Sequence, residues 1–180
     1  MIPGVGACPL LPLRPPVKTP ASDGKKWSLS RHAPVADASP IIGLAKIGRL
    51  QILDGLAHEV LIPREVWNEI VAGGGARPEV ESIERRFMDS VRDPDEASVA
   101  GFRREIDAGE AAALALATAN PGCLLLIDDA AGRQVAEAHQ LRCIGTAGLL
   151  LRAKRAGLTD SLTRDLEALQ QQEPFFFGWT

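Results

Sequence analysis

The chain has 180 residues, of which 46% are hydrophobic, and this is enough for one domain with an ordinary core but too little for two. Its formal net charge is −3, its three cysteines show no C-x-x-C spacing, and no apolar run approaches the roughly 18 residues of a membrane-spanning helix. These features argue against a helical membrane protein, and they fit a reducing compartment better than a disulfide framework, with the cytoplasm as the expectation.

Residues 1–34 differ from the rest of the chain. They are rich in proline and lack the apolar region of a secretory signal, so we expect a flexible tail followed by one domain at residues 35–180. The tail contains five basic residues and one acidic residue, which leaves 15 basic and 22 acidic residues and a formal net charge of −7 for the domain. An acidic domain does not favour sequence-blind binding to nucleic acid, although a local basic track remains compatible with this charge.

Short apolar runs alternate with helical stretches from Val35 onward. VADAS predicts a short strand, and IIGLAKIGRLQIL, with apolar residues at helical spacing, predicts one helix after it. HEVLI predicts the second strand, and Pro63 is expected to be the first residue of the next helix, PREVWNEIVA, which the glycines from Gly73 end. The polar stretch 77–104 predicts helix, with a short strand near Val91.

The second half of the chain continues this alternation. AGEAAALALATA predicts a helix that the turn at Asn120-Pro121-Gly122 ends, and CLLLI predicts a strand buried on both faces of a parallel sheet. GRQVAEAHQ predicts a helix, RCIGT a strand, AGLLLRAKRAG a helix, and SLTRDLEALQQQ a last helix with Asp160 or Ser161 as its N-cap. The order predicts an α/β fold, a three-layer α/β/α sandwich with a central, mostly parallel sheet.

Acidic side chains lie at or near the ends of these predicted strands. They are Asp37, Glu69, Glu110, Asp128 and Asp129. Open parallel sheets bind ligands at the carboxyl ends of their strands, and gathered carboxylates repel one another unless cations offset their charge. Oxygen ligands favour Mg²⁺ or Mn²⁺, and the three histidines lack the spacing of a zinc site. Two such ions can generate hydroxide and stabilise the leaving oxygen in phosphodiester hydrolysis.

Each acidic residue also has an ordinary structural explanation. Asp37 can cap a turn, Glu69 can be a solvated helix residue, and Glu110 can stabilise a helix N-terminus. One residue of the pair Asp128 and Asp129 is expected to be the N-cap of the next helix while the other faces the site.

Three further residues are candidates for orienting water or binding nucleic acid. The hydroxyls of Ser39 and Thr146 lie in predicted strand-end turns, where they can orient water or contact phosphate, although turn formation explains them equally well. Arg133 can bind a phosphate backbone, and a solvated helix face is its alternative role.

Five strings, in order, together resemble one known family: DASPIIGLAKIGRLQIL, VLIPREVWNEI, DAGEAAALALA, LLLIDDAAGR and IGTAGLLLRAKRAGL. They resemble the PIN domain of VapC-type toxin ribonucleases and, within it, the subgroup called domain of unknown function 3368. The resemblance implies a metal-dependent ribonuclease fold whose acidic cluster is Asp37, Glu69, Glu110 and Asp128 or Asp129, with Asp129 favoured by its spacing from the strand. The chain departs from the commoner pattern in having Glu110 where Asp is usual.

The resemblance also implies a function and partners. We expect an endoribonuclease dependent on Mg²⁺ or Mn²⁺, the toxin of a toxin-antitoxin pair, which forms a homodimer and binds a small antitoxin protein. A PIN-like nucleic-acid-binding or regulatory module without turnover is the alternative. A phosphoryl-transfer enzyme with strand-end aspartates is less compatible, because the Asp-Asp pair comes late in the chain. A dinucleotide-binding fold and a serine hydrolase are excluded, since G-x-G-x-x-G and G-x-S-x-G are missing.

Overall fold

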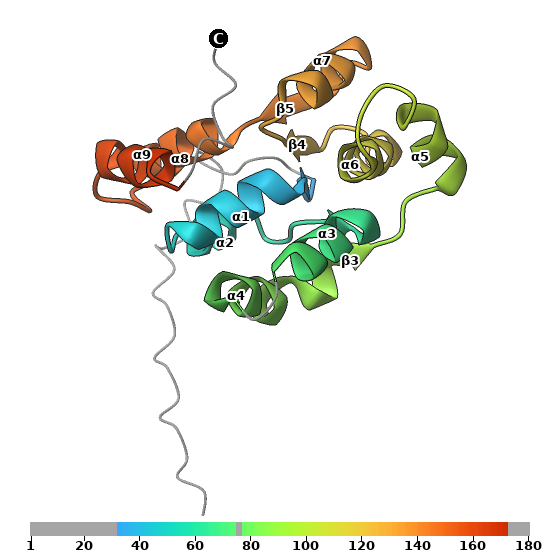
Figure 1. Cartoon of the computed structure of the whole chain (residues 1–180). Coiled ribbons are helices and arrows are strands. Elements are labelled where there is room, and N and C mark those ends of the chain that lie inside the picture. The colour runs from blue at the N-terminus through green and yellow to red at the C-terminus, as the bar shows by residue number, and fades with distance from the viewer. Residues whose placement is uncertain (1–31, 75–76, 173–180) are drawn as a thin grey trace, which may run out of the picture.

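The computed structural model describes residues 32–74 and 77–172, in which short parallel strands alternate with helices (Figure 1). The predicted tail lies outside the described residues except for its last three. The strands are β1 (Val35–Ala36), β2 (Ile62–Pro63), β3 (Val91–Arg92), β4 (Leu124–Leu126) and β5 (Arg142–Ile144). The helices are α1 (Ala38–Lys46), α2 (Gln51–Leu56), α3 (Arg64–Gly74), α4 (Pro78–Phe87), the 3₁₀ turn η1 (Met88–Ser90), α5 (Glu96–Phe102), α6 (Ala108–Ala119), α7 (Ala130–Ala138), α8 (Thr146–Arg155) and α9 (Leu162–Gln170).

All of these strands pair in parallel. One sheet has the order β1-β4-β5, and β2 pairs with β3 in a second. A parallel bridge between Val35 and Leu61 joins the two sheets, and the N–H of Ala36 donates to the carbonyl of Leu61 at 2.9 Å. The strands therefore follow the order β3-β2-β1-β4-β5, as expected for the predicted parallel sheet.

Side chains that alternate along the strands divide the core into two clusters, one on each face of the sheet. Ala36, Ile62 and Leu126 pack with helices α1, α2, α3, α4, α8 and α9. Their chain neighbours Val35 and Leu125 pack instead with α5, α6 and α7. Because each face of the sheet is covered by helices, the predicted three-layer α/β/α sandwich is confirmed.

Two local predictions were wrong. The stretch IIGLAKIGRLQIL forms two helices rather than one, because Gly48 adopts a φ of +65° and ends α1, and α2 begins at Gln51. Pro63 lies in β2, and α3 begins one residue later at Arg64. Pro63 is therefore the last residue of a two-residue strand and directly precedes the helix.

The remaining predicted elements occur close to the expected bounds. Helix α6 covers the whole of AGEAAALALATA, the short strand β3 includes Val91, and Ser161 is the N-cap of α9. Within residues 32–74 and 77–172, no helix is both long and apolar enough to cross a membrane.

Candidate metal centre and cleft

The carboxyl ends of β1 and β4 lie side by side at the point where the strand order reverses. Strands β1, β2 and β3 extend the sheet in one direction, and β4 and β5 extend it in the other. Asp37 follows β1 directly, and Asp128 and Asp129 follow β4 after a single buried isoleucine. Such a reversal leaves a crevice at the strand ends, which is where open parallel sheets bind their ligands.

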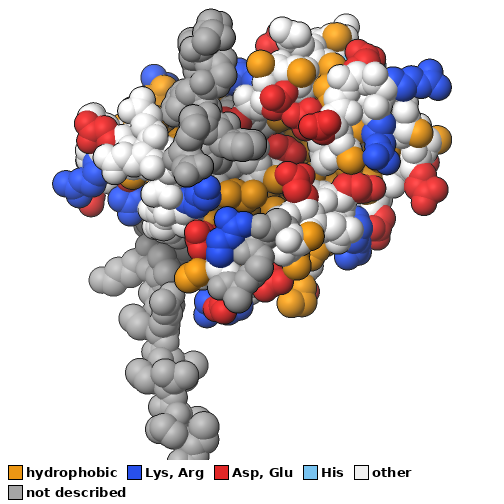
Figure 2. Space-filling model, viewed as in Figure 1, with side chains coloured by type: hydrophobic (Ala, Val, Ile, Leu, Met, Phe, Trp, Pro, Cys, Tyr) orange, Lys and Arg blue, Asp and Glu red, His pale blue; other side chains and the backbone are white. Residues whose placement is uncertain are grey.

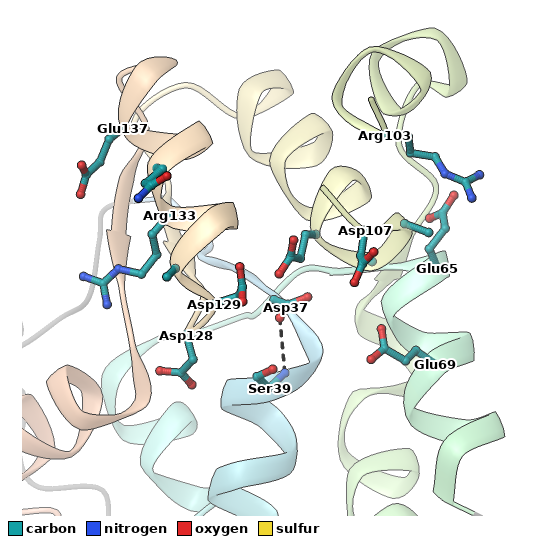
Figure 3. A pocket seen from close by; sticks show the side chains of 15 residues that line it. Asp37, Ser39, Glu65, Glu69, Arg103, Asp107, Asp128, Asp129, Arg133 and Glu137 are labelled. Carbon is teal, nitrogen blue, oxygen red and sulfur yellow. Dashed lines mark hydrogen bonds between the residues drawn. The ribbon is translucent and has the colours of Figure 1, made fainter. Parts of the chain in front are cut away.

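A cleft of about 1020 Å³ opens at this position. Acidic side chains dominate its lining, and Figure 2 shows Asp and Glu side chains gathered on this face. The lining carboxylates are Asp37, Glu65, Glu69, Asp107, Glu110, Asp128, Asp129 and Glu137. The cations of the described lining are Arg103 and Arg133 (Figure 3). The volume lies just above the usual range for ligand pockets, about 300 to 1,000 Å³.

Asp37 is the most deeply placed carboxylate of the cleft. It is the N-cap of α1, its Oδ2 accepts from the N–H of Ser39 at 3.4 Å, and only 4% of the residue is exposed. Burial raises the pKa of Asp37 to about 6, and the charges of Glu69 and Asp128 add to the effect, while hydrogen bonds from backbone N–H groups oppose it. The turn-capping role and the site role therefore coincide in one side chain.

Glu110 lies in the first turn of α6 and points toward the same group of carboxylates. Burial, followed by the charges of Asp129 and Asp37, raises the pKa of Glu110 to about 7. The backbone N–H of Asp107 donates to Glu110 and lowers that pKa, as in a capping box. Glu110 is thus held at the helix start and is also close to two other acids.

The two adjacent aspartates have different partners. Asp129 is the N-cap of α7, and its Oδ1 accepts from the N–H groups of Ala131 at 2.7 Å and Gly132 at 3.0 Å. Asp128 accepts from Thr146 through both oxygens. Both aspartates line the cleft, so the residue that caps the helix also faces the site, near Glu110.

Glu69 reaches the cleft from α3, and a glycine on α6 leaves room for it. A Cβ built on Gly109 would lie 2.7 Å from Oε2 of Glu69 and 3.8 Å from Oδ1 of Asp37. Partial burial raises the pKa of Glu69, and the charge of Asp107 adds to it. The missing side chain at position 109 therefore lets Glu69 approach Asp37.

The structure brings most of the predicted site residues into this one cleft. Those that line it are Asp37, Ser39, Glu69, Glu110, Asp128, Asp129 and Arg133. Thr146 does not line it: the residue is 1% exposed and its hydroxyl binds Asp128. This hydroxyl is therefore engaged with a carboxylate and does not point into the open cleft.

Sequence reasoning missed Glu65 and Asp107. Glu65 precedes Glu69 by four residues on α3, and Asp107 precedes Glu110 by three, so each lies on the same helix face as a predicted residue. Oε2 of Glu65 is buried without a hydrogen-bond partner, and Asp107 makes no side-chain capping bond. The sequence signal that could have identified these two residues is their helical spacing from Glu69 and Glu110.

The donor set of the cleft fits a hard divalent cation. All of the candidate ligands are carboxylate oxygens, burial and mutual charge raise the pKa values of three of them, and Glu65 carries an unpartnered buried oxygen. In the part of the chain that the structure describes, no three such side chains are already grouped to hold an ion.

Comparison with known proteins gives one result at the level of family. A family model described as a PIN domain matches residues 33–178. No curated protein and no solved structure matches the chain. The match covers β1 through α9 and therefore includes every carboxylate of the cleft.

Proposed function

The chain belongs to the PIN-domain family, and from this premise we propose that it is an endoribonuclease dependent on Mg²⁺ or Mn²⁺ that hydrolyses RNA phosphodiester bonds. PIN domains are generally nucleases, and they typically use divalent metal ions. The observation that carries the proposal is the meeting of Asp37, Glu110 and Asp129 in one cleft at the reversal of the strand order.

Asp37, Glu110 and Asp129 would hold the cation, with Asp128 beside them. A bound divalent cation supplies a lowered pKa for water and charge neutralisation at the phosphoryl oxygens. The backbone fixes two of these ligands, because Asp37 and Asp129 are each anchored by N–H groups of the helix that they cap. Such anchoring keeps the carboxylates in place without a substrate, as preorganised electrostatic sites require.

The carboxylates of the cleft also repel a negatively charged substrate. A phosphodiester is an anion, and it meets eight acidic side chains in this cleft. Without charge compensation, repulsion would keep it out. Substrate binding and cation binding are therefore expected to depend on each other.

A nucleic-acid-binding module without turnover is the second candidate, and one observation favours it. Among residues 32–74 and 77–172, no three potential ligands are already assembled around one point. Glu110 replaces the usual Asp with a longer side chain, and a displaced ligand could bind an ion without supporting hydrolysis. Cation binding without cleavage would identify this case.

The toxin role, the small antitoxin and the homodimer stay proposals that rest on the family resemblance. An RNA-cleaving toxin requires a partner that blocks its cleft, and a cleft lined by acids would be blocked by a basic segment of such a partner. Gel filtration tests the dimer, and a monomer at micromolar concentration would contradict it.

Incubation of the purified protein with an end-labelled single-stranded RNA tests the activity. We expect cutting with Mn²⁺, no cutting with EDTA, and loss of cutting in Asp37→Ala and Glu110→Ala. A substrate with one 2′-deoxynucleotide at the cut site should still be cut, because water rather than the 2′-hydroxyl is the nucleophile. Equal cutting by all proteins would indicate a contaminating ribonuclease, and Mn²⁺ binding without any cutting would select the binding module.

A further inference from the structure

Two arginines are the cations of the described cleft lining, and they lie on different helices. Arg103 is the C-cap of α5, and Arg133 lies on α7. Figure 3 shows them on opposite sides of Asp37, Asp129 and Asp107, with Glu137 beyond this group on the side of Arg133. The cleft thus has an acidic centre and one guanidinium at each side.

Neither guanidinium is engaged by the protein. Across the described part of the chain, the side chains of Arg103 and Arg133 form no hydrogen bond and no ion pair, although eight carboxylates line the same cleft. By contrast, Arg49 and Arg64 each bind a carboxylate, at 2.9 and 3.0 Å. The hydrogen-bond donors of both cleft arginines therefore remain available to a ligand.

The position of Arg133 links it to the acidic centre. It follows Asp129, the N-cap of α7, by four residues. Nη1 of Arg133 lies 3.4 Å from the point where Gly145 would carry a Cβ, and Oδ1 of Asp128 lies 2.5 Å from the same point. Because Gly145 has no side chain, the guanidinium and this carboxylate share the space beside it.

We propose that Arg133 and Arg103 bind the phosphates on the two sides of the phosphodiester that is cut, so that a single strand crosses the cleft from α7 to α5. Guanidinium groups bind phosphate through two parallel hydrogen bonds, and they offset the repulsion that the carboxylates exert on the strand. Only 4% of Asp37 is exposed, so the central phosphate must enter the cleft to approach it. A single strand fits this requirement. This inference rests on the proposed function, since it assigns the path of that substrate.

Salt-dependent binding of a fluorescently labelled single-stranded RNA tests the proposal without requiring turnover. Affinity is measured with Ca²⁺ from about 50 to about 200 mM salt for the wild type, Arg103→Gln, Arg133→Gln and the double variant. Arg104→Gln is the matched control, because Arg104 is exposed next to Arg103 but does not line the cleft. Thermal unfolding of each variant verifies its folding.

Each cleft variant should lower the slope of log affinity against log salt by about 0.7, and the affinity itself about fivefold near 0.1 M salt. The double variant should lose both contributions, and Arg104→Gln should match the wild type. Slopes equal to that of the wild type in both cleft variants would overturn the inference, and so would no binding of RNA by the wild type. If the wild type binds RNA without cutting it, the proposed hydrolysis fails, while the slopes still decide the role of the arginines.

Discussion

Thr146 binds both carboxylate oxygens of Asp128. Its hydroxyl donates to Oδ2 at 2.5 Å and its backbone N–H donates to Oδ1 at 2.8 Å, across 18 residues of sequence. Asp128 follows β4 and Thr146 is the first residue of α8, so the pair ties the start of one helix to the end of the neighbouring strand. We interpret Thr146 as a positioning residue for the acidic cluster.

Replacing Thr146 with Val tests this role. The change keeps the volume but leaves Oδ2 of Asp128 without its donor, which should lower the free energy of unfolding by about 1 to 3 kcal/mol. It should also lower kcat more than it raises KM, because the cluster loses its orientation, whereas Thr146→Ser should restore both. Urea denaturation and cleavage kinetics measure the two effects. An unchanged kcat in a folded Val variant would refute the positioning role.

Stability should fall with rising pH because of Asp37. Folding raises the pKa of Asp37 from 3.8 to about 6, so the folded state holds the proton more tightly than the unfolded chain. The stabilisation by the protonated form is complete below about pH 4 and is lost as pH rises through 6; the pKa difference corresponds to about 3 kcal/mol. Glu110, with a pKa of about 7, acts in the same direction.

Denaturation of wild type and Asp37→Asn across this pH range isolates the effect. The wild type should lose up to about 3 kcal/mol relative to the variant between about pH 4 and 7, and Mg²⁺ should restore stability only in the wild type. Parallel pH curves for the two proteins would show that Asp37 is not perturbed.

Gly109 should control the position of Glu69. A Cβ on Gly109 would lie 2.7 Å from Oε2 of Glu69, so Gly109→Ala should push this carboxylate away from Asp37. Because Glu69 is a flexible side chain, its displacement should cost little stability. Moving its negative charge away from Asp37 should weaken Mn²⁺ binding. Gly101→Ala is the control, because its Cβ would meet nothing within 4 Å, and it should stabilise helix α5 by about 0.5 to 1 kcal/mol. Equal Mn²⁺ affinity in both variants would contradict this account.

The contact between Arg49 and Asp165 should stabilise the fold without affecting the site. Asp165 is 3% exposed, accepts from Nε of Arg49 at 2.9 Å and also from the hydroxyl of Thr159. Arg49→Met leaves this buried carboxylate without its cation and should cost about 3 kcal/mol, whereas breaking an exposed pair costs less than about 1 kcal/mol. The exposed pair of Arg64 and Asp93 supplies that comparison through Arg64→Met. Equal costs in the two variants would contradict the prediction.

The sequence was most informative where one local signal determines the structure. Helix α6 matched its predicted bounds because its alanines favour helix and Asn120-Pro121-Gly122 ends it. Asp37, Asp128 and Asp129 could be placed because they lie at the carboxyl ends of strands of one parallel sheet. Their proximity then follows from the topology alone.

Other features depend on how elements pack, which the sequence does not express locally. Glu65 and Asp107 lie at helical spacing from Glu69 and Glu110, but only the contact between α3 and α6 brings the two pairs into one cleft. The hydroxyl of Thr146 could not be assigned to Asp128, because α7 and β5 lie between the two residues in the chain. The break at Gly48 was visible as a glycine, but apolar spacing continued across it and favoured one helix.

The initial rate of RNA cleavage by Glu110→Gln, compared with wild type in Mn²⁺, tests the central claim most directly. Glutamine keeps the size of the side chain and removes the charge that would bind the cation, so the rate should fall at least about 100-fold, or about 2.7 kcal/mol of transition-state stabilisation. Asp93→Asn, which changes an exposed carboxylate outside the cleft lining, should cleave like the wild type. Glu110→Gln that cleaves at the wild-type rate would contradict a catalytic role for this carboxylate cluster.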